Sequence, residues 1–230
     1  MVFYTDRHCS VCKRLGKGEH EFIFMLFQSL MIGYYNYAVI LTYISMLISF
    51  GGISYVVDDK ILAACICLLI SGICDTFDGK IAQTKVRTPH EKRFGIQLDS
   101  LADTVCFGIL PAVIVYHIGG PRNHVTLAVA GFYALTAIIR LAWFNVDEEQ
   151  RQNTTSGCRE FYTGLPVTVS AFVLPVVLAA SSTDRVSMML AGTIALLVLG
   201  VAFISPVKVP KLNFSLGHQK NDEQEDHSEQ

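Results

Sequence analysis

Four aspartates at helical spacing lie within two consecutive apolar stretches of the sequence. Asp75 and Asp78 are three residues apart, and Asp99 and Asp103 are four residues apart. Residues at these spacings share one face of an α-helix, so each helix would present two carboxylates to the same side. Because an ionised side chain in a membrane helix costs about 3 kcal/mol on insertion scales, four of them need a compensating partner. The pattern predicts a divalent-metal site.

The chemistry of the four carboxylates restricts which metal ions can bind. Crowded carboxylates repel one another and take up protons unless a cation supplies positive charge. Hard oxygen ligands favour Mg²⁺, Mn²⁺ or Ca²⁺ over zinc, and an ion held in this way keeps positions for phosphate oxygens. We therefore predict Mg²⁺ or Mn²⁺ as the cofactor of a phosphoryl-transfer reaction, with Ca²⁺ as an alternative, non-activating occupant.

Basic residues surround the aspartates and offer partners for phosphate groups. They are Lys80, Lys85, Arg87, Lys92 and Arg93. Basic loops also arise from membrane topology alone, so their position does not by itself assign them to a substrate.

The elements that carry the aspartates are predicted to be membrane-spanning helices. Of the 230 residues, 51% are hydrophobic and 17% are charged, and the mean hydropathy is +0.41. The apolar runs approach the ~20 residues with which a helix crosses ~30 Å of hydrocarbon. We predict an all-α integral membrane bundle of six transmembrane helices, over residues 37–53, 61–82, 94–118, 125–146, 163–180 and 186–205. The two aspartate-bearing spans are consecutive and antiparallel, so their acidic faces can meet.

Polar segments precede and follow these spans. Residues 1–36 are predicted to be a cytoplasmic segment in which residues 19–35 form an amphipathic helix in the membrane interface; an early start of the first span is the alternative. Residues 37–206 form the membrane domain, and residues 207–230 are predicted to be a disordered cytoplasmic tail. No secretory signal peptide is expected, because the first long apolar run starts late and lacks a cleavage pattern.

The distribution of Lys and Arg predicts the orientation in the membrane. With the N-terminus inside, fourteen of the 18 basic residues fall in inner segments, whereas Lys60, Arg122 and Arg185 fall in outer loops and Arg140 lies within a span. Positive residues accumulate in cytoplasmic loops, so both termini and the aspartates are expected on the cytoplasmic side of the cell membrane. Nothing in the sequence suggests a nucleic-acid partner.

The seven cysteines do not indicate a disulfide framework. Their number is odd, and four of them lie inside apolar runs. Cys9 and Cys12, beside His8, belong either to a solvated tail or to half of a zinc site that lacks a matching second half nearby.

Two segments carry a resemblance to a known family. The run Asp75-Thr-Phe-Asp-Gly-Lys-Ile-Ala82, followed by Gly95-Ile-Gln-Leu-Asp-Ser-Leu-Ala-Asp103, closely resembles the signature of the CDP-alcohol phosphotransferases. The resemblance implies a six-helix membrane enzyme, typically a homodimer. Such enzymes transfer a phosphatidyl or similar group from a CDP-linked donor to an alcohol and release CMP.

The resemblance also implies roles for individual residues. Asp103 would lie near the metal and deprotonate the attacking alcohol. The metal ligands would be Asp75, Asp78 and Asp99, together with Asp103. The residues that border the CDP group would be Gly79, Ala82 and Gly95.

The sequence departs from the family signature at two places. Gln83 stands where the family normally has an arginine, and the stretch before Gly95 is longer than usual. A neutral Gln replaces neither the charge nor the planar fork of a guanidinium. Gln83 would still border CDP, and the phosphate-binding cation would come from Lys85, Arg87 or Arg93.

A narrower resemblance concerns the acceptor. Residues 94–103, 140–145 and 161–166 look like the corresponding segments of bacterial and archaeal phosphatidylserine synthases. The resemblance implies CDP-diacylglycerol as the donor and favours L-serine as the acceptor. The candidate acceptor-side residues are Ser100, Arg140, Asn145, Thr163, Gly164 and Pro166.

Several of these residues have ordinary structural alternatives. Arg140 could pair with an aspartate, a phosphate or the carboxylate of serine, or could extend to the membrane interface. Asn145 could bind a polar substrate or cap a helix. Gly164 and Pro166 could shape a pocket, although Pro is also common at a helix start.

Three classes of function compete. The first is phosphatidyl transfer to serine, and its nearest rival uses inositol phosphate, glycerol phosphate or another small alcohol. A cation transporter would distribute its acids across the membrane depth, whereas all four aspartates are predicted near one face. A non-catalytic scaffold leaves four costly carboxylates without a role.

Overall fold

The computed structural model describes residues 33, 37–82, 88–154, 161–206 and 208–210. Within these ranges, only the backbone is described for residues 37–38, 78–82, 151–154, 161–163 and 208–210.

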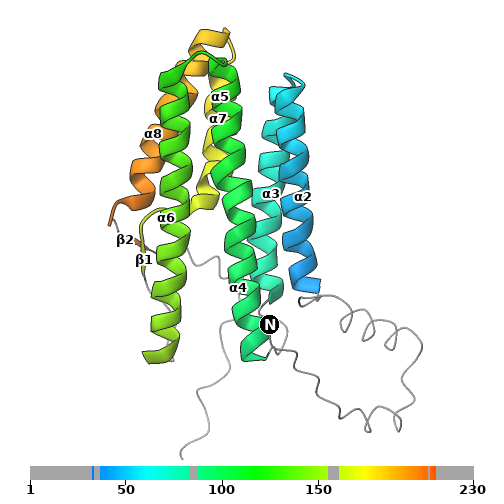
Figure 1. Ribbon diagram of the computed structural model, residues 1–230, viewed down its shortest axis with the longest axis vertical. Coiled ribbons are helices and arrows are strands. Elements are labelled where there is room, and N and C mark those ends of the chain that lie inside the picture. The colour runs from blue at the N-terminus through cyan, green and yellow to red at the C-terminus, as the bar shows by residue number, and fades with distance from the viewer. Residues whose placement is uncertain (1–32, 34–36, 83–87, 155–160, 207, 211–230) are drawn as a thin grey trace, which may run out of the picture.

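The helices lie side by side along one direction (Figure 1). They are α2 (Tyr37–Val57), α3 (Ile61–Ala82), α4 (Pro89–Asp103), the π-helical turn η2 (Thr104–Ile109), α5 (Leu110–Gly119), α6 (His124–Thr154), the 3-10 turn η3 (Val167–Val169), α7 (Ser170–Ala180) and α8 (Arg185–Ile204).

The lengths and surfaces of the helices are those of an integral membrane protein. Within the described residues, four helical stretches are long and apolar enough to cross a bilayer: Val39–Val57, Pro89–Gly119, His124–Gln150 and Arg185–Ile204. Two shorter apolar helices, Ile61–Phe77 and Val167–Ala180, accompany them. The predicted all-α membrane bundle is therefore confirmed, while the exact count of six crossings stays a prediction. The predicted interfacial helix at residues 19–35 lies outside the described residues.

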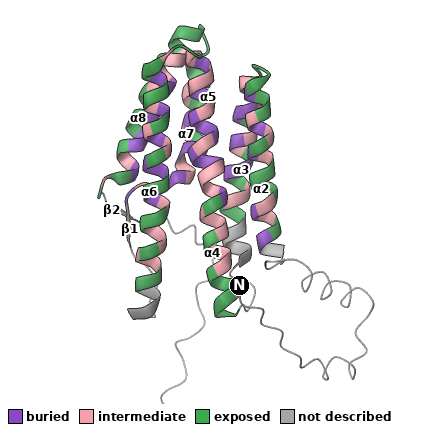
Figure 2. Cartoon of the chain, in the orientation of Figure 1, coloured by how far each residue is buried: buried purple, intermediate pink, exposed green. Residues whose placement is uncertain are grey.

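Large apolar side chains cover the outside of the bundle as well as its interior. Exposed residues follow the outward sides of the helices (Figure 2). Examples are Leu47, Leu62, Leu135, Val176 and Ile194, whose exposed fractions all exceed one half. Such a surface is suited to contact with lipid, because apolar side chains exposed to hydrocarbon carry no free-energy penalty. Helix association in lipid then depends on close packing and polar contacts.

Polar contacts join the first helices of the bundle. The hydroxyl oxygens of Ser49 and Ser71 are 2.7 Å apart, and Ser71 also donates to the Ser45 carbonyl at 3.1 Å. All three serines are buried between α2 and α3. Hydrogen bonds of this kind favour helix association within a membrane, where water cannot compete for the groups. They hold α3, and therefore Asp75 one turn beyond Ser71, against α2.

An ion-pair cluster joins the opposite end of the bundle. Asp59, in the turn between α2 and α3, accepts a hydrogen bond from His117 Nε2 at 3.0 Å and another from the Arg185 guanidinium at 3.2 Å. The His117 hydrogen bond, followed by the charge of Arg185, lowers the pKa of Asp59 below its usual value. This cluster connects the α2–α3 turn with the end of α5 and the start of α8. The ends of the helices remote from Asp75 are thus in contact through exposed charged groups, which contribute little stability.

The helices that follow turns begin with recognisable caps. Thr88 precedes α4 and forms a capping box with Glu91, while Pro89 occupies the first helical turn. Asp184 caps α8 by accepting hydrogen bonds from the backbone N–H groups of Val186 and Ser187. These local signals explain why α4 begins at Pro89, five residues before the apolar stretch from which its start was predicted.

The fifth predicted span starts at the wrong residue. We expected a helix from Thr163, whereas residues Phe161–Thr163 form strand β1 and helix α7 begins at Ser170. Gly164 adopts a positive φ of 81°, which breaks helical backbone, and Pro166 precedes the turn η3. Strand β1 pairs antiparallel with β2 (Lys208–Pro210). The start of the predicted tail is therefore part of this two-stranded ribbon.

The approach of α3 to α7 depends on a glycine. A Cβ atom built on Gly72 would lie 2.7 Å from the Cβ of Ala171, closer than real side chains come. Gly72 is one turn before Asp75, so this contact also sets the position of the aspartate-bearing end of α3. On Gly131, an added Cβ would meet nothing within 4 Å.

The replacement Gly72→Ala is expected to lower the melting temperature of the purified protein by several degrees. Overpacking of a close contact typically costs about 1–3 kcal/mol, or roughly 3–10 °C for a chain of this size. Thermal unfolding in detergent, followed by circular dichroism, measures the change. Gly131→Ala is the matched control and should unfold at the wild-type temperature or above it. Equal destabilisation by both substitutions would contradict the close contact.

Candidate metal centre

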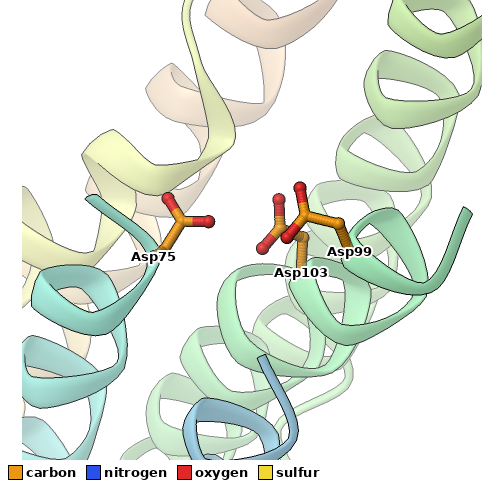
Figure 3. Close-up of side chains that lie close together, drawn as sticks. All are labelled: Asp75, Asp99 and Asp103. Atoms are coloured by element: carbon orange, nitrogen blue, oxygen red, sulfur yellow. The ribbon is translucent and has the colours of Figure 1, made fainter. Parts of the chain in front are cut away.

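Three of the predicted ligands lie together between two helices. Asp75 extends from α3, and Asp99 and Asp103 extend from α4; one carboxylate oxygen of each lies within 4.8 Å of the others. Figure 3 shows Asp75 facing the other two side chains across the space between the helices. All three side chains are half-buried. Asp78 follows Asp75 by one helical turn, and its side chain lies outside the described residues.

The arrangement of these oxygens fits a hard divalent cation. Oxygen ligands lie about 2.0–2.6 Å from Mg²⁺ or Ca²⁺, so ligands of one ion are at most about 4–5 Å apart. The observed separations match this limit, and three carboxylates with no nitrogen or sulfur among them are a typical oxygen donor set. Asp75, Asp99 and Asp103 would hold the ion.

Small polar side chains lie on the interior side of the carboxylates. Ser71 is one turn before Asp75 on α3, and Cys106 follows Asp103 in η2. Ser45 of α2 connects them, since its hydroxyl lies 3.4 Å from the Ser71 carbonyl and 3.7 Å from the Cys106 sulfur. Sequence reasoning did not select these residues. Their signal was the occurrence of hydroxyl and thiol groups within apolar runs, which in a membrane usually means a polar partner.

The residues predicted to border CDP are described only in part. Gly95 lies in α4, half-buried and one turn before Asp99. Gly79 and Ala82 belong to the last turns of α3, of which only the backbone is described. Gln83, Lys85 and Arg87 lie outside the described residues.

Polar contacts join α4 to α6 beside the aspartates. The Ser100 hydroxyl, adjacent in sequence to Asp99, donates to the Asn145 side-chain oxygen at 3.0 Å. Arg93 forms an ion pair with Glu149 at 3.4 Å on an exposed surface, where such pairs contribute little stability. Helix α6 continues to Thr154, so the alternative that Asn145 caps the end of a helix is wrong.

Arg140 connects α6 to the segment before α7. Its side chain is only 7% exposed, which makes the alternative of an extension to the membrane interface wrong. It donates to the Leu165 carbonyl at 3.3 Å and to the Gly164 carbonyl at 3.4 Å, and it lies 5.5 Å from the Phe144 ring. A Cβ on Gly164 would approach Arg140 Nε to 3.1 Å. Two predicted acceptor-side residues, Arg140 and Gly164, are thus in direct contact.

The two other predicted residues of this segment flank Gly164. Thr163 ends strand β1, with only its backbone described, and Pro166 is exposed immediately before η3. The four cysteines with described side chains, Cys65, Cys67, Cys74 and Cys106, form no disulfide with one another. The Cys9 and Cys12 pair lies outside the described residues.

Comparison with known proteins agrees with this membrane bundle and its acidic cluster. The sequence model of the CDP-alcohol phosphatidyltransferase family matches residues 35–204. The chain belongs to this family of membrane transferases of phospholipid biosynthesis.

Several curated relatives have related names. The archaetidylserine synthase of Methanothermobacter thermautotrophicus is 29% identical over 74% of this chain and 65% of its own length. The CDP-diacylglycerol–serine O-phosphatidyltransferase of Helicobacter pylori is 28% identical over 76% of this chain and 72% of its own length. The Saccharomyces cerevisiae protein of the latter name is 36% identical over 46% of this chain and 38% of its own length. The chain therefore spans about two thirds of the archaeal relative.

Replacing Asp75 with Asn is expected to weaken Mn²⁺ binding at least about tenfold, because even the loss of a residue that only supports a metal ligand has an effect of that size. Titration of Mn²⁺ into the purified protein, followed by electron paramagnetic resonance, measures the affinity. Asp58→Asn removes an exposed carboxylate from the other end of the bundle and should leave the affinity unchanged. Equal affinities of the two variants would show that the metal binds elsewhere.

Proposed function

We propose that this protein transfers a phosphatidyl group from CDP-diacylglycerol to L-serine, producing phosphatidylserine and CMP. The observation that carries the proposal is the convergence of Asp75, Asp99 and Asp103 from two helices of a family member. The names of the relatives, which include serine O-phosphatidyltransferases and an archaetidylserine synthase, support serine as the acceptor.

The four aspartates divide the chemistry between metal binding and proton transfer. Asp75, Asp78 and Asp99 bind Mg²⁺ or Mn²⁺ together with Asp103. The bound metal would stabilise negative charge on the transferred phosphate and on CMP. Asp103 accepts the proton of the serine hydroxyl as its oxygen bonds to the phosphorus that carries diacylglycerol. The bond from this phosphorus to the CMP oxygen breaks, and CMP leaves with the electron pair.

The donor is held by residues around the same end of α3 and α4. Gly79 and Gly95 have no Cβ atom and Ala82 has only a methyl group, so the CDP group can approach the backbone there, and Gln83 borders it beside Ala82. Cationic contacts to the diphosphate come from Lys85, Arg87 or Arg93. Arg93 would exchange its exposed pairing with Glu149 for a phosphate, at little cost because the pair is solvated.

The acceptor side extends along α6. Ser100 is next to Asp99 and bonds to Asn145, while Arg140, five residues earlier on α6, holds the Gly164 carbonyl. Helix α6 therefore contacts both the aspartate-bearing helix α4 and residues 164–165. We propose that Ser100 and Asn145 contact serine, and that Arg140 positions Thr163, Gly164 and Pro166 as a wall of the pocket.

The membrane orientation and assembly are also part of the proposal. The excess of basic residues in the segments on the aspartate side favours a cytoplasmic site and cytoplasmic termini. Water-soluble serine would reach the site from that side, and CDP-diacylglycerol would arrive within the bilayer of the cell membrane. We further propose a homodimer, on the basis of the family resemblance.

Acceptor identity is tested by incubating the purified protein with CDP-diacylglycerol, Mn²⁺ and a panel of alcohols. L-serine is expected to stimulate CMP release at least about tenfold more than inositol phosphate or glycerol phosphate. A difference of this size corresponds to about 1.4 kcal/mol of preferential binding in the transition state, well within the reach of one paired polar contact. Stimulation by another alcohol, with none by serine, would retain the family chemistry and reject serine as the acceptor.

Asp103→Asn is expected to lower the rate of CMP release by about 10²–10⁴-fold at saturating Mn²⁺, because an amide cannot accept the proton of the alcohol. The change should appear mainly in kcat, while Asp75→Asn should mainly raise the Mn²⁺ concentration needed for half-maximal activity. Full activity of Asp103→Asn at saturating metal would reject Asp103 as the base.

A further inference from the structure

The aspartate-bearing helix changes its winding immediately after Asp103. Residues Thr104–Ile109 form a π-helical turn, in which the Leu110 N–H bonds to the Val105 carbonyl five residues earlier. A π turn accommodates one extra residue, which rotates the preceding segment by about 100° relative to a continuous α-helix. The direction in which Asp99 and Asp103 point therefore depends on this turn, as α5 beyond it is packed in the core.

A proline explains why the turn needs support from outside the helix. In a regular α-helix, the Phe107 carbonyl would accept a hydrogen bond from the N–H of residue 111. Residue 111 is proline, which has no N–H and whose ring displaces the carbonyl four residues earlier. Phe107 is fully buried, so this carbonyl cannot turn to water for a substitute.

Two side chains from other helices supply the missing donors. The Tyr133 hydroxyl of α6 donates to the Phe107 carbonyl at 2.6 Å, and the Ser170 hydroxyl at the start of α7 lies 3.4 Å from the same oxygen. Both side chains are completely buried. Ser170 also donates to its neighbouring Val167 carbonyl at 2.8 Å, so Tyr133 is the stronger partner of Phe107.

We propose that Tyr133 is a positioning residue, whose hydrogen bond to the Phe107 carbonyl maintains the π turn that directs Asp99 and Asp103 toward Asp75. The inference rests on the proposed metal site and adds a residue outside it. Without the hydroxyl, the carbonyl loses its short hydrogen bond and the turn can rewind, which rotates the two aspartates away from α3. The first effect is on metal affinity, since three oxygens must stay within 4.8 Å of one another.

The test is the substitution Tyr133→Phe, which removes the hydroxyl and keeps the ring. Mn²⁺ affinity is expected to fall about 10–100-fold, the usual effect of losing a group that orients a metal ligand. At saturating Mn²⁺, kcat should recover to within about twofold of wild type, because bound metal restores the carboxylate geometry. Ser170→Ala should have a smaller effect on affinity, in line with its longer distance.

Thr136→Val is the matched control. Thr136 is also buried on α6, but its hydroxyl bonds within its own helix, to the Tyr133 carbonyl at 2.8 Å. Its Mn²⁺ affinity should equal that of wild type even if the melting temperature falls. If Tyr133→Phe lowers stability but binds Mn²⁺ like wild type, Tyr133 is merely structural and the inference is overturned. If the unmodified protein binds no Mn²⁺, the proposed metal site fails, and the inference fails with it.

Discussion

Electrostatic repulsion among the carboxylates is the constraint on which the rest of the structure depends. Two like charges about 5 Å apart repel by about 3 kcal/mol at an effective dielectric constant near 20. Asp75, Asp99 and Asp103 form three pairs whose nearest oxygens are no farther apart than 4.8 Å. The fold can hold these groups together only if a cation or protons compensate the charge. A site of this kind binds a divalent metal ion. The ion can promote phosphoryl transfer when some of its coordination positions remain open to phosphate oxygens.

The bundle keeps the carboxylates together through contacts that are effective in hydrocarbon. Apolar side chains gain nothing by leaving lipid for another helix, so small residues and hydrogen bonds determine the packing. Gly72 allows α3 to approach α7, and Ser49 and Ser71 join α3 to α2. On the other helix, the Ser100–Asn145 contact joins α4 to α6 beside Asp99. Each of these contacts lies within about two turns of an aspartate.

The surroundings of the cluster suit a reaction between a lipid and a water-soluble molecule. Helix α4 begins with the polar residues that follow Thr88, and the apolar core begins at Ala102 and Cys106. Asp99 and Asp103 lie at this boundary, where a diphosphate headgroup can remain polar while its acyl chains stay in the membrane. At the other end, the Asp59, His117 and Arg185 cluster connects three helix ends and leaves the aspartate end separate from it.

The sequence by itself determined the membrane class, the helices and the acidic faces. The length of an apolar run is enough to predict a membrane span. The i, i+3 and i, i+4 spacing of the aspartates, with the geometry of an α-helix, is enough to predict that each pair shares one face. It also predicted that α3 and α4 would face each other. Helix starts were less accurate where capping or backbone conformation decides them, as at Pro89 and at Gly164 with its positive φ.

Tertiary structure alone decided which polar groups meet. For Arg140 the sequence left open a polar partner or an extension to the interface, and only the fold showed it buried against the Gly164 and Leu165 carbonyls. The sequence likewise did not predict the π turn after Asp103, although it contains Pro111. A proline removes one donor, but whether the helix kinks or rewinds depends on what its neighbours donate. Here Tyr133 and Ser170, distant in sequence, provide the donors, and a pattern within one helix cannot reveal them.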